Sequence, residues 1–260
     1  MNITGLDQRL RRRSLIGYAL GMGLYTLVVV AMYPAFKNST TLDEFTEQSP
    51  GTAALFGISG SLTSPTGWLN ANIYNNFLPL IVLLIAIGYG AACIAGQDED
   101  QTLGFVATLP LTRRRIAAEK LTAMAALLVP VIAVTFVCAL AGRAFDLDVD
   151  VWHLLGVSIA VLLLGLAFGA FAMLIGALTG ARASALGITS AVAATTYLLN
   201  SLAPVVDWLK PARYLSPFFY AVGDNQLDDG LSPWWALVLL ALVAVLVGTT
   251  LIAFERLDIH

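Results

Sequence analysis

Charged residues are scarce in this 260-residue chain, and its longest apolar runs contain none. Asp, Glu, Lys and Arg together make up 12% of the residues, whereas hydrophobic residues make up 58%. The mean hydropathy of +0.80 lies far above the range of soluble globular domains. This scarcity of charge excludes an ordinary soluble domain and indicates an integral membrane protein.

Sequence motifs for catalysis and for metal or nucleotide binding are also absent. His153 and His260 are the only histidines, Cys93 and Cys138 are the only cysteines, and neither H-E-x-x-H nor G-x-S-x-G occurs. We therefore expect no enzyme activity, no metal site and no cofactor in this chain. Because it lacks a G-x-x-x-x-G-K-[ST] loop, ATP-driven work would need an ATPase on another polypeptide.

Six segments are long enough to cross a hydrocarbon core of roughly 30 Å as helices of about 20 residues. None of them contains Asp, Glu, Lys or Arg. They are Leu15–Phe36, Ile73–Ala95, Leu121–Gly142, Val151–Leu178, Ala185–Val206 and Pro233–Phe254. We predict an all-α membrane protein with six transmembrane helices in one domain, residues 1–260.

The distribution of Lys and Arg predicts how these spans are oriented. With the N-terminus inside, the inner side holds ten basic residues: Arg9, Arg11, Arg12, Arg13, Arg113, Arg114, Arg115, Lys120, Arg182 and Arg256. The outer side then holds four, namely Lys37, Arg143, Lys210 and Arg213. Both termini are therefore expected in the cytoplasm.

The connections between the spans differ in length and composition. The outer segment Lys37–Asn72 is expected to be a partly helical loop that is too small for a domain. The turn Gly180–Ser184 is short, which makes the fourth and fifth spans antiparallel neighbours. The aromatic residues of Asp207–Ser232 predict short helices at the outer membrane interface.

Small residues within the spans predict close helix packing. Glycines recur four positions apart at Gly17/Gly21, Gly165/Gly169 and Gly176/Gly180, a spacing that lets helices approach closely. Cys93 and Cys138 also fall within spans, where a small apolar side chain is useful and a disulfide is not expected. We interpret all of these positions as packing residues, and we do not take the glycines as a dimer contact.

Polar groups that serve ion-driven transport are missing from the spans. A carrier driven by ions needs ionisable residues at membrane depth, whereas His153 lies near the outer end of the fourth span and is interpreted as an interfacial side chain. Uncharged polar residues cluster on the fifth span: Thr195, Thr196, Tyr197, Asn200 and Ser201. Thr196 and Asn200 share a helical face, so the cluster either lines a translocation path or bonds a neighbouring helix.

The segment between the second and third spans is short and charged. Asp98, Glu99 and Asp100 suit the first turn of a helix, and Leu103, Val106 and Ala107 then form one apolar stripe before Pro110. We predict a short amphipathic helix on the inner surface. The basic run Arg113–Arg115 either anchors the chain at the inner surface or contacts an acidic partner.

This segment resembles the pattern A-G-E-x-E-x-G-T-L-x-x-L-L-A-T-P-[VL]-S-R of the ABC-2-type permease family, the membrane subunits of ABC exporters with the type V fold. The matching residues are Ala95–Leu103 and Ala107–Arg113, with further similarity at Leu62–Trp68, Leu78–Leu80 and Tyr214–Phe218. The chain departs from the pattern at Gln97 and Gln101, and Leu109 stands before Pro110. The coupling contacts are therefore expected to differ in detail.

The resemblance implies a role for the charged segment. It would form a cytoplasmic coupling helix that fits a cleft on a separate ATP-binding subunit, which binds ATP and Mg. The basic N-terminal segment would form an interfacial elbow helix. The residues assigned to coupling are Asp98, Glu99, Asp100, Thr102, Leu103 and Phe105, with Arg113 and Arg114 secondary.

We therefore expect a permease subunit in a prokaryotic plasma membrane, paired with a second permease chain and two ATPase subunits. Its uncharged spans suit export of an amphipathic or hydrophobic small molecule such as a drug or antibiotic, a peptide or a lipid. Two alternatives remain: a scaffold or sensor subunit that recruits a cytoplasmic partner without transport, and an ion-coupled carrier. Nothing in the sequence supports binding of nucleic acid.

Overall fold

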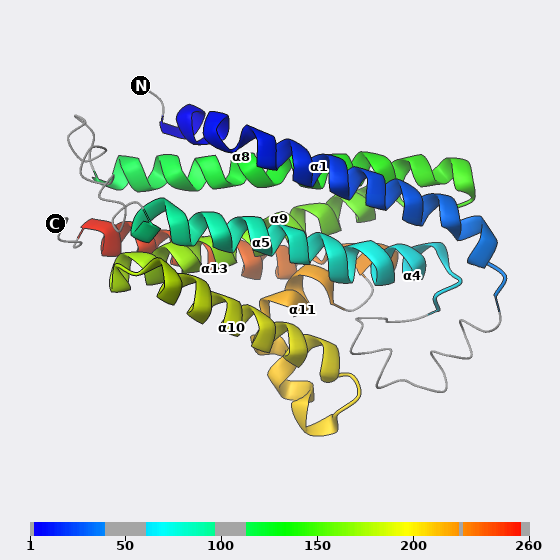
Figure 1. Cartoon of the computed structure of the whole chain (residues 1–260). Coiled ribbons are helices and arrows are strands. Elements are labelled where there is room, and N and C mark those ends of the chain that lie inside the picture. Colours follow the sequence, from blue (N-terminus) through cyan, green and yellow to red (C-terminus); the bar gives the residue numbers. More distant parts are fainter. Residues whose placement is uncertain (1–2, 40–60, 97–112, 224–225, 256–260) are drawn as a thin grey trace.

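Six long helices dominate the structure, a computed structural model that describes residues 3–39, 61–96, 113–223 and 226–255 (Figure 1). All six are long and apolar enough to cross a membrane, which confirms the predicted number of spans. These spans are Arg13–Phe36, Pro65–Ala91, Arg114–Phe145, Val151–Thr179, Arg182–Leu202 and Pro233–Ala253. Within the described residues the fold is helical throughout, as predicted.

The first three spans are built from helices of several kinds. They comprise α1 (Ile3–Phe36), α4 (Pro65–Leu69), the π-helix η1 (Asn70–Phe77), α5 (Leu78–Ala91), a second π-helix η2 (Ala92–Gly96), α8 (Arg113–Leu140) and the 3-10 helix η3 (Ala141–Phe145). The second span is therefore a composite of α4, η1 and α5. It begins eight residues before the predicted start at Ile73 because Ser64 caps its first turn and Pro65 occupies the first helical position.

The remaining spans are single α-helices, with short helices between the last two. They are α9 (Val151–Thr179), α10 (Arg182–Leu202), the 3-10 helix η4 (Asp207–Leu215), α11 (Pro217–Val222), α12 (Gln226–Asp229) and α13 (Pro233–Glu255). Short helices between the fifth and sixth spans were predicted. Asp150 caps α9 by accepting hydrogen bonds from the backbone N–H groups of Trp152 and His153 at 2.7 and 3.1 Å.

Helix α9 lies at the centre of the bundle and packs against α5, α8, α10 and α13. Glycines on α9 permit this close approach, because a Cβ at Gly165 would collide with Val82 and Leu128, and one at Gly169 with Met124. The predicted packing role of these glycines thus holds within this chain. Gly17 and Gly21 differ, since a Cβ on either would meet open space.

Helix α1 packs along α8 and is continuous from Ile3 to Phe36. The basic N-terminal segment therefore extends the first span in line, with no break among the described residues of α1. A separate elbow helix would require such a break, so that prediction is not confirmed.

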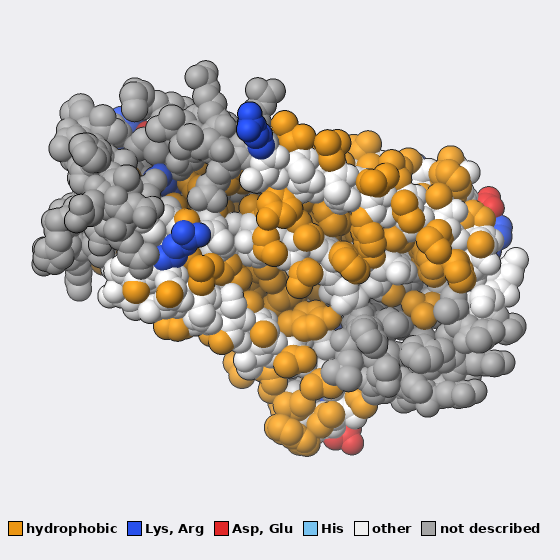
Figure 2. All heavy atoms as spheres, viewed as in Figure 1, with side chains coloured by type: hydrophobic (Ala, Val, Ile, Leu, Met, Phe, Trp, Pro, Cys, Tyr) orange, Lys and Arg blue, Asp and Glu red, His pale blue; other side chains and the backbone are white. Residues whose placement is uncertain are grey.

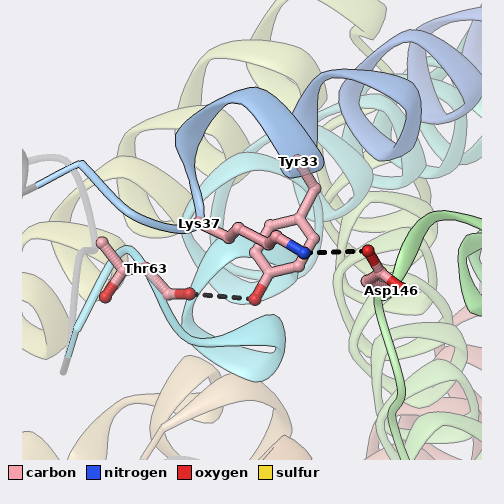
Figure 3. Close-up of polar contacts among 4 residues, drawn as sticks. All are labelled: Tyr33, Lys37, Thr63 and Asp146. Carbon is pink, nitrogen blue, oxygen red and sulfur yellow. Dashed lines mark hydrogen bonds and ion pairs between the residues drawn. The ribbon is translucent and has the colours of Figure 1, made fainter.

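The two ends of the bundle differ in charge. Both termini lie at one end in Figure 1, and the basic side chains visible in Figure 2 gather mainly there, while hydrophobic side chains cover the flank. At the opposite end Lys37 and Asp146 form an ion pair of 2.8 Å, and Tyr33 donates a hydrogen bond to the carbonyl oxygen of Thr63 (Figure 3). The hydrogen bond with Asp146 raises the pKa of Lys37.

Helix α10 diverges from the bundle, and its far end, with η4, protrudes from it (Figure 1). The turn that joins α9 to α10 is tight because Gly180 adopts a left-handed conformation, with φ of 65°. Gly180 N–H bonds the carbonyl oxygen of Gly176 at 2.9 Å. The helix is thus fixed to α9 at one end and separates from it toward the other.

Candidate functional site

A large apolar groove lies between α5 and α10, with a volume of about 780 Å³. Its walls follow from helical spacing: residues 77, 80, 84 and 88 share one face of the second span, and residues 186, 190, 194 and 197 face them from α10. The lining residues are Asn76, Phe77, Pro79, Leu80, Leu83, Leu84, Ile87, Gly88, Leu186, Ser190, Ala193, Ala194, Tyr197 and Phe218. None of them carries a charge.

The groove is open because its walls carry small or outward-facing side chains. Leu80 is 60% exposed and Leu84 is 53% exposed, although both belong to a membrane-spanning helix. A Cβ added at Gly88 would meet nothing within 4 Å. The groove is therefore open space along one side of the second span, and an apolar molecule of moderate size would fit it.

At the end of the groove away from the termini, α10 meets η1 through a hydrogen bond. The Tyr197 hydroxyl donates to Asn76 Oδ1 at 2.7 Å. Asn76 Nδ2 in turn donates to the carbonyl oxygen of Ala71 at 2.7 Å, so the amide is oriented by both partners. The Tyr197 ring packs edge-on against Phe218, with ring centroids 5.5 Å apart.

The π-helical geometry of η1 places Asn76 at this position. In a π-helix each carbonyl is paired five residues along, and such segments within α-helices occur frequently at functional sites. The sequence of η1, NANIYNNF, is too polar to suggest a span. Two of its asparagines bond the backbone of the same span: Asn76 donates to Ala71, and Asn72 Nδ2 donates to the carbonyl oxygen of Trp68 at 2.9 Å.

Of the five polar residues predicted on the fifth span, the groove is lined by Tyr197. Thr196 donates its hydroxyl to backbone carbonyls of its own helix, and Asn200 accepts a hydrogen bond from Arg213 of η4 at 3.4 Å. Thr195 is exposed and Ser201 is buried. A translocation role for these four residues stays a prediction.

The predicted coupling residues between Asp98 and Phe105 lie outside the described residues. Arg113 is the first residue of α8, and Arg114 is exposed on the same helix. Arg182, at the start of α10, lies beside the end of η2, because a Cβ at Gly96 would be 3.3 Å from Arg182 Cδ. The segment that leads into residues 97–112 therefore touches one wall of the groove.

Lys120 is a feature that sequence reasoning missed. The sequence predicts it as a basic residue of the inner surface, whereas in the structure it is only 1% exposed and lies inside the bundle on α8. The adjacent Glu119 pairs with Arg115 at 3.4 Å, on a more exposed face of the same helix. Lys120 stands directly before the apolar residues of the third span. At such a position the sequence does not distinguish a buried side chain from one at the membrane interface.

The sequence model of the ABC-2 transporter protein family matches residues 1–259. The chain belongs to this family. It is therefore a multi-pass membrane protein and a permease component of an ABC transporter, which confirms the resemblance drawn from residues 95–113. No curated protein matches the sequence.

Membership in the ABC-2 family also gives the groove its context. Permeases of this family are transport subunits without an ATPase site of their own, and they typically work with an ATP-binding subunit. Within the described part of the chain, no group of three or more His, Cys, Asp or Glu residues is placed to hold a metal ion.

Proposed function

We propose that this permease exports an amphipathic or hydrophobic compound, and that the groove between α5 and α10 is part of the path its cargo takes. The observation that carries the proposal is the uncharged lining of a groove of about 780 Å³ within two membrane spans. Such walls do not compensate the loss of hydration of a charged molecule, whereas they bury an apolar one favourably. Charge on the cargo would therefore have to remain outside the groove.

ATP hydrolysis would reach the groove through the segment between the second and third spans. We propose that Asp98, Glu99, Asp100, Thr102, Leu103 and Phe105 contact a separate ATP-binding subunit, with Arg113 and Arg114 beside them. Arg182 of α10 lies against Gly96, so movement at the end of η2 would act directly on α10. Two ATPase subunits and a second permease chain would complete the transporter, with ATP and Mg bound by the ATPase.

The proposed orientation has both termini in the cytoplasm of a prokaryotic cell. The basic excess at that end of the bundle supports it through the preference for Lys and Arg on the inner side. A tag at the C-terminus, tested with a protease in intact and permeabilised cells, measures it. Cleavage of the tag in intact cells would show that the C-terminus lies outside and would contradict the proposed orientation.

The first experiment is purification of the tagged chain in mild detergent from its native host, followed by identification of co-purifying proteins and measurement of ATP hydrolysis. The wild type is compared with the double variant Asp98→Ala/Leu103→Ala. Lys37→Ala is the matched control, because Lys37 lies in an exposed ion pair at the opposite end of the bundle. We expect a P-loop ATPase that co-purifies with the wild type and the control and is lost from the double variant.

Other outcomes separate the alternatives. An ATPase that is recovered equally with the double variant would contradict the coupling assignment. A partner without cargo-stimulated ATP hydrolysis would favour the scaffold or sensor role. Transport that persists without ATP but stops when an ion gradient is dissipated would favour an ion-coupled carrier.

A further inference from the structure

Three different elements meet at one end of the groove. Tyr197 on α10, Asn76 on η1 and Phe218 on α11 all line that end. Asn76 lies 12 residues before Gly88, so the groove extends about 18 Å along the second span at 1.5 Å per residue. That end is the one farther from the chain termini, on the side where Lys37 and Asp146 pair.

Both partners of the hydrogen bond at this end make further contacts. The Asn76 amide donates to the carbonyl oxygen of Ala71, which turns its own oxygen toward Tyr197. Behind Tyr197, the Phe218 ring is 2% exposed and contacts Phe168 of α9, with ring centroids 5.8 Å apart. Movement of α10 away from η1 would therefore break this bond, whereas Asn76 would keep its own bond to Ala71.

We propose that the hydrogen bond between Tyr197 and Asn76 closes the groove on the side away from the termini, and that it breaks when cargo leaves on that side. Tyr197 and Asn76 are then positioning residues that set the ratio of closed to open conformations. The role of cargo rests on the proposed function, whereas the closure itself can be measured without cargo or ATPase.

The bond is suited to such a role because its strength is modest. A hydrogen bond between membrane helices typically changes an equilibrium about threefold, and up to about tenfold in favourable cases. A hydrogen bond of this strength favours the closed conformation but still allows the open one to form. The closure can be reversed by the conformational energy that a partner ATPase provides.

The test uses a cysteine reporter within the groove. Ser190 lines the groove and is exposed there, so Ser190→Cys is introduced into a chain in which Cys93 and Cys138 are replaced by alanine. The protein is reconstituted in phosphatidylcholine vesicles, and a membrane-impermeant sulfonated maleimide is added to the side away from the termini. The labelling rate of the reporter measures how often the closed end opens.

Tyr197→Phe removes the hydroxyl and keeps the ring, and we expect it to raise the labelling rate about two- to tenfold. Tyr74→Phe is the matched control, since it removes a buried hydroxyl that pairs with Ser158 at 3.2 Å between η1 and α9, away from the groove. Its labelling rate should equal that of the parent. Equal rates in the parent and Tyr197→Phe, or equal increases in both variants, would overturn the proposal.

A double-mutant cycle distinguishes loss of this one bond from general destabilisation of the bundle. Asn76→Ala should also raise the rate, and the double variant Tyr197→Phe/Asn76→Ala should label no faster than the faster single variant. Multiplied effects in the double variant would show that the residues act separately and would refute the closure. If closure is confirmed but no ATPase co-purifies with the permease, the proposed function fails while this inference stands.

Discussion

The indole N–H of Trp68 donates a hydrogen bond of 2.9 Å to the carbonyl oxygen of Val29. The start of the second span is therefore bound to the backbone of the first. Tyr33 adds a second bond of 2.9 Å from α1, to the carbonyl oxygen of Thr63 (Figure 3). Together these bonds make the first two spans one unit at this end of the bundle.

Replacing Trp68 by phenylalanine should weaken this unit. Trp68→Phe removes the indole donor from a site that is only 8% exposed, so we expect a loss of about 1–2 kcal/mol in the free energy of unfolding. The thermal unfolding midpoint in detergent measures it. Trp234→Phe is the control, because Trp234 is 75% exposed and should tolerate the change. Equal midpoints for the two variants would contradict the prediction.

Gly90 should not tolerate any side chain. A Cβ at Gly90 would collide with the backbone carbonyl of Gly169 on α9, which cannot move aside as a side chain would. We expect Gly90→Ala to destabilise the bundle by about 1–3 kcal/mol, the usual cost of overpacking. Gly88→Ala, two residues earlier on the same helix, meets open space and should leave stability unchanged or raise it. A scan of thermal unfolding distinguishes the two variants, and the reverse order of stability would refute the packing described for α5 and α9.

The N-cap of α9 predicts a dependence on pH. Hydrogen bonds from the backbone N–H groups of His153 and Trp152 lower the pKa of Asp150 below its ordinary value of 3.8. The stability that the ionised carboxylate contributes is therefore present above the ordinary value and lost as the pH falls through the lower pKa of the folded protein.

Asp150→Asn keeps a hydrogen-bond acceptor at the cap but removes the titrating group. We expect the wild type to have the higher unfolding midpoint at about pH 7, and the difference from Asp150→Asn to shrink at about pH 3. Midpoints recorded across this pH range test the expectation. A difference that does not change with pH would show that the charge of Asp150 contributes nothing to the cap.

Filling the groove should inhibit transport without harming the fold. A leucine at position 88 would enter open space between α5 and α10, so Gly88→Leu should lower cargo-stimulated ATP hydrolysis of the assembled transporter severalfold. Gly187→Leu is the control, because Gly187 also faces open space but does not line the groove. If both variants keep full stimulation, the cargo path lies elsewhere.

Hydropathy alone was sufficient to predict the six spans. Runs such as Val151–Thr179 are long, apolar and uncharged, which is sufficient to indicate a membrane-spanning helix. The same criterion missed the start of the second span. Asn70 and Asn72 fall in the predicted outer loop, but Asn70 is 3% exposed in the structure, and Asn72 bonds the carbonyl oxygen of Trp68.

The candidate site was predictable only in part. Tyr197 was selected because it stands in a polar cluster on an apolar span. Asn76 lies inside the predicted second span Ile73–Ala95, but nothing in the sequence around it predicts a role in a transport path. The two residues are 121 positions apart, and no local pattern indicates that they meet. The S-P-T-G sequence at Ser64–Gly67 is the signal that moves the start of the second span from Ile73 to Pro65, since Ser and Pro in this order are typical of a helix start.

The left-handed turn at Gly180 joins α10 to α9 at one end only. A small rotation of α10 about this turn would therefore displace its far end by several ångströms. The helix is 21 residues long, so Leu202 lies about 30 Å from the turn, and a rotation of about 10° there would displace Leu202 by about 5 Å. The same rotation would shift Tyr197 by about 4 Å, farther than a hydrogen bond can stretch. A rotation of about 10° beside Arg182 and Gly96 would thus be enough to separate Tyr197 from Asn76.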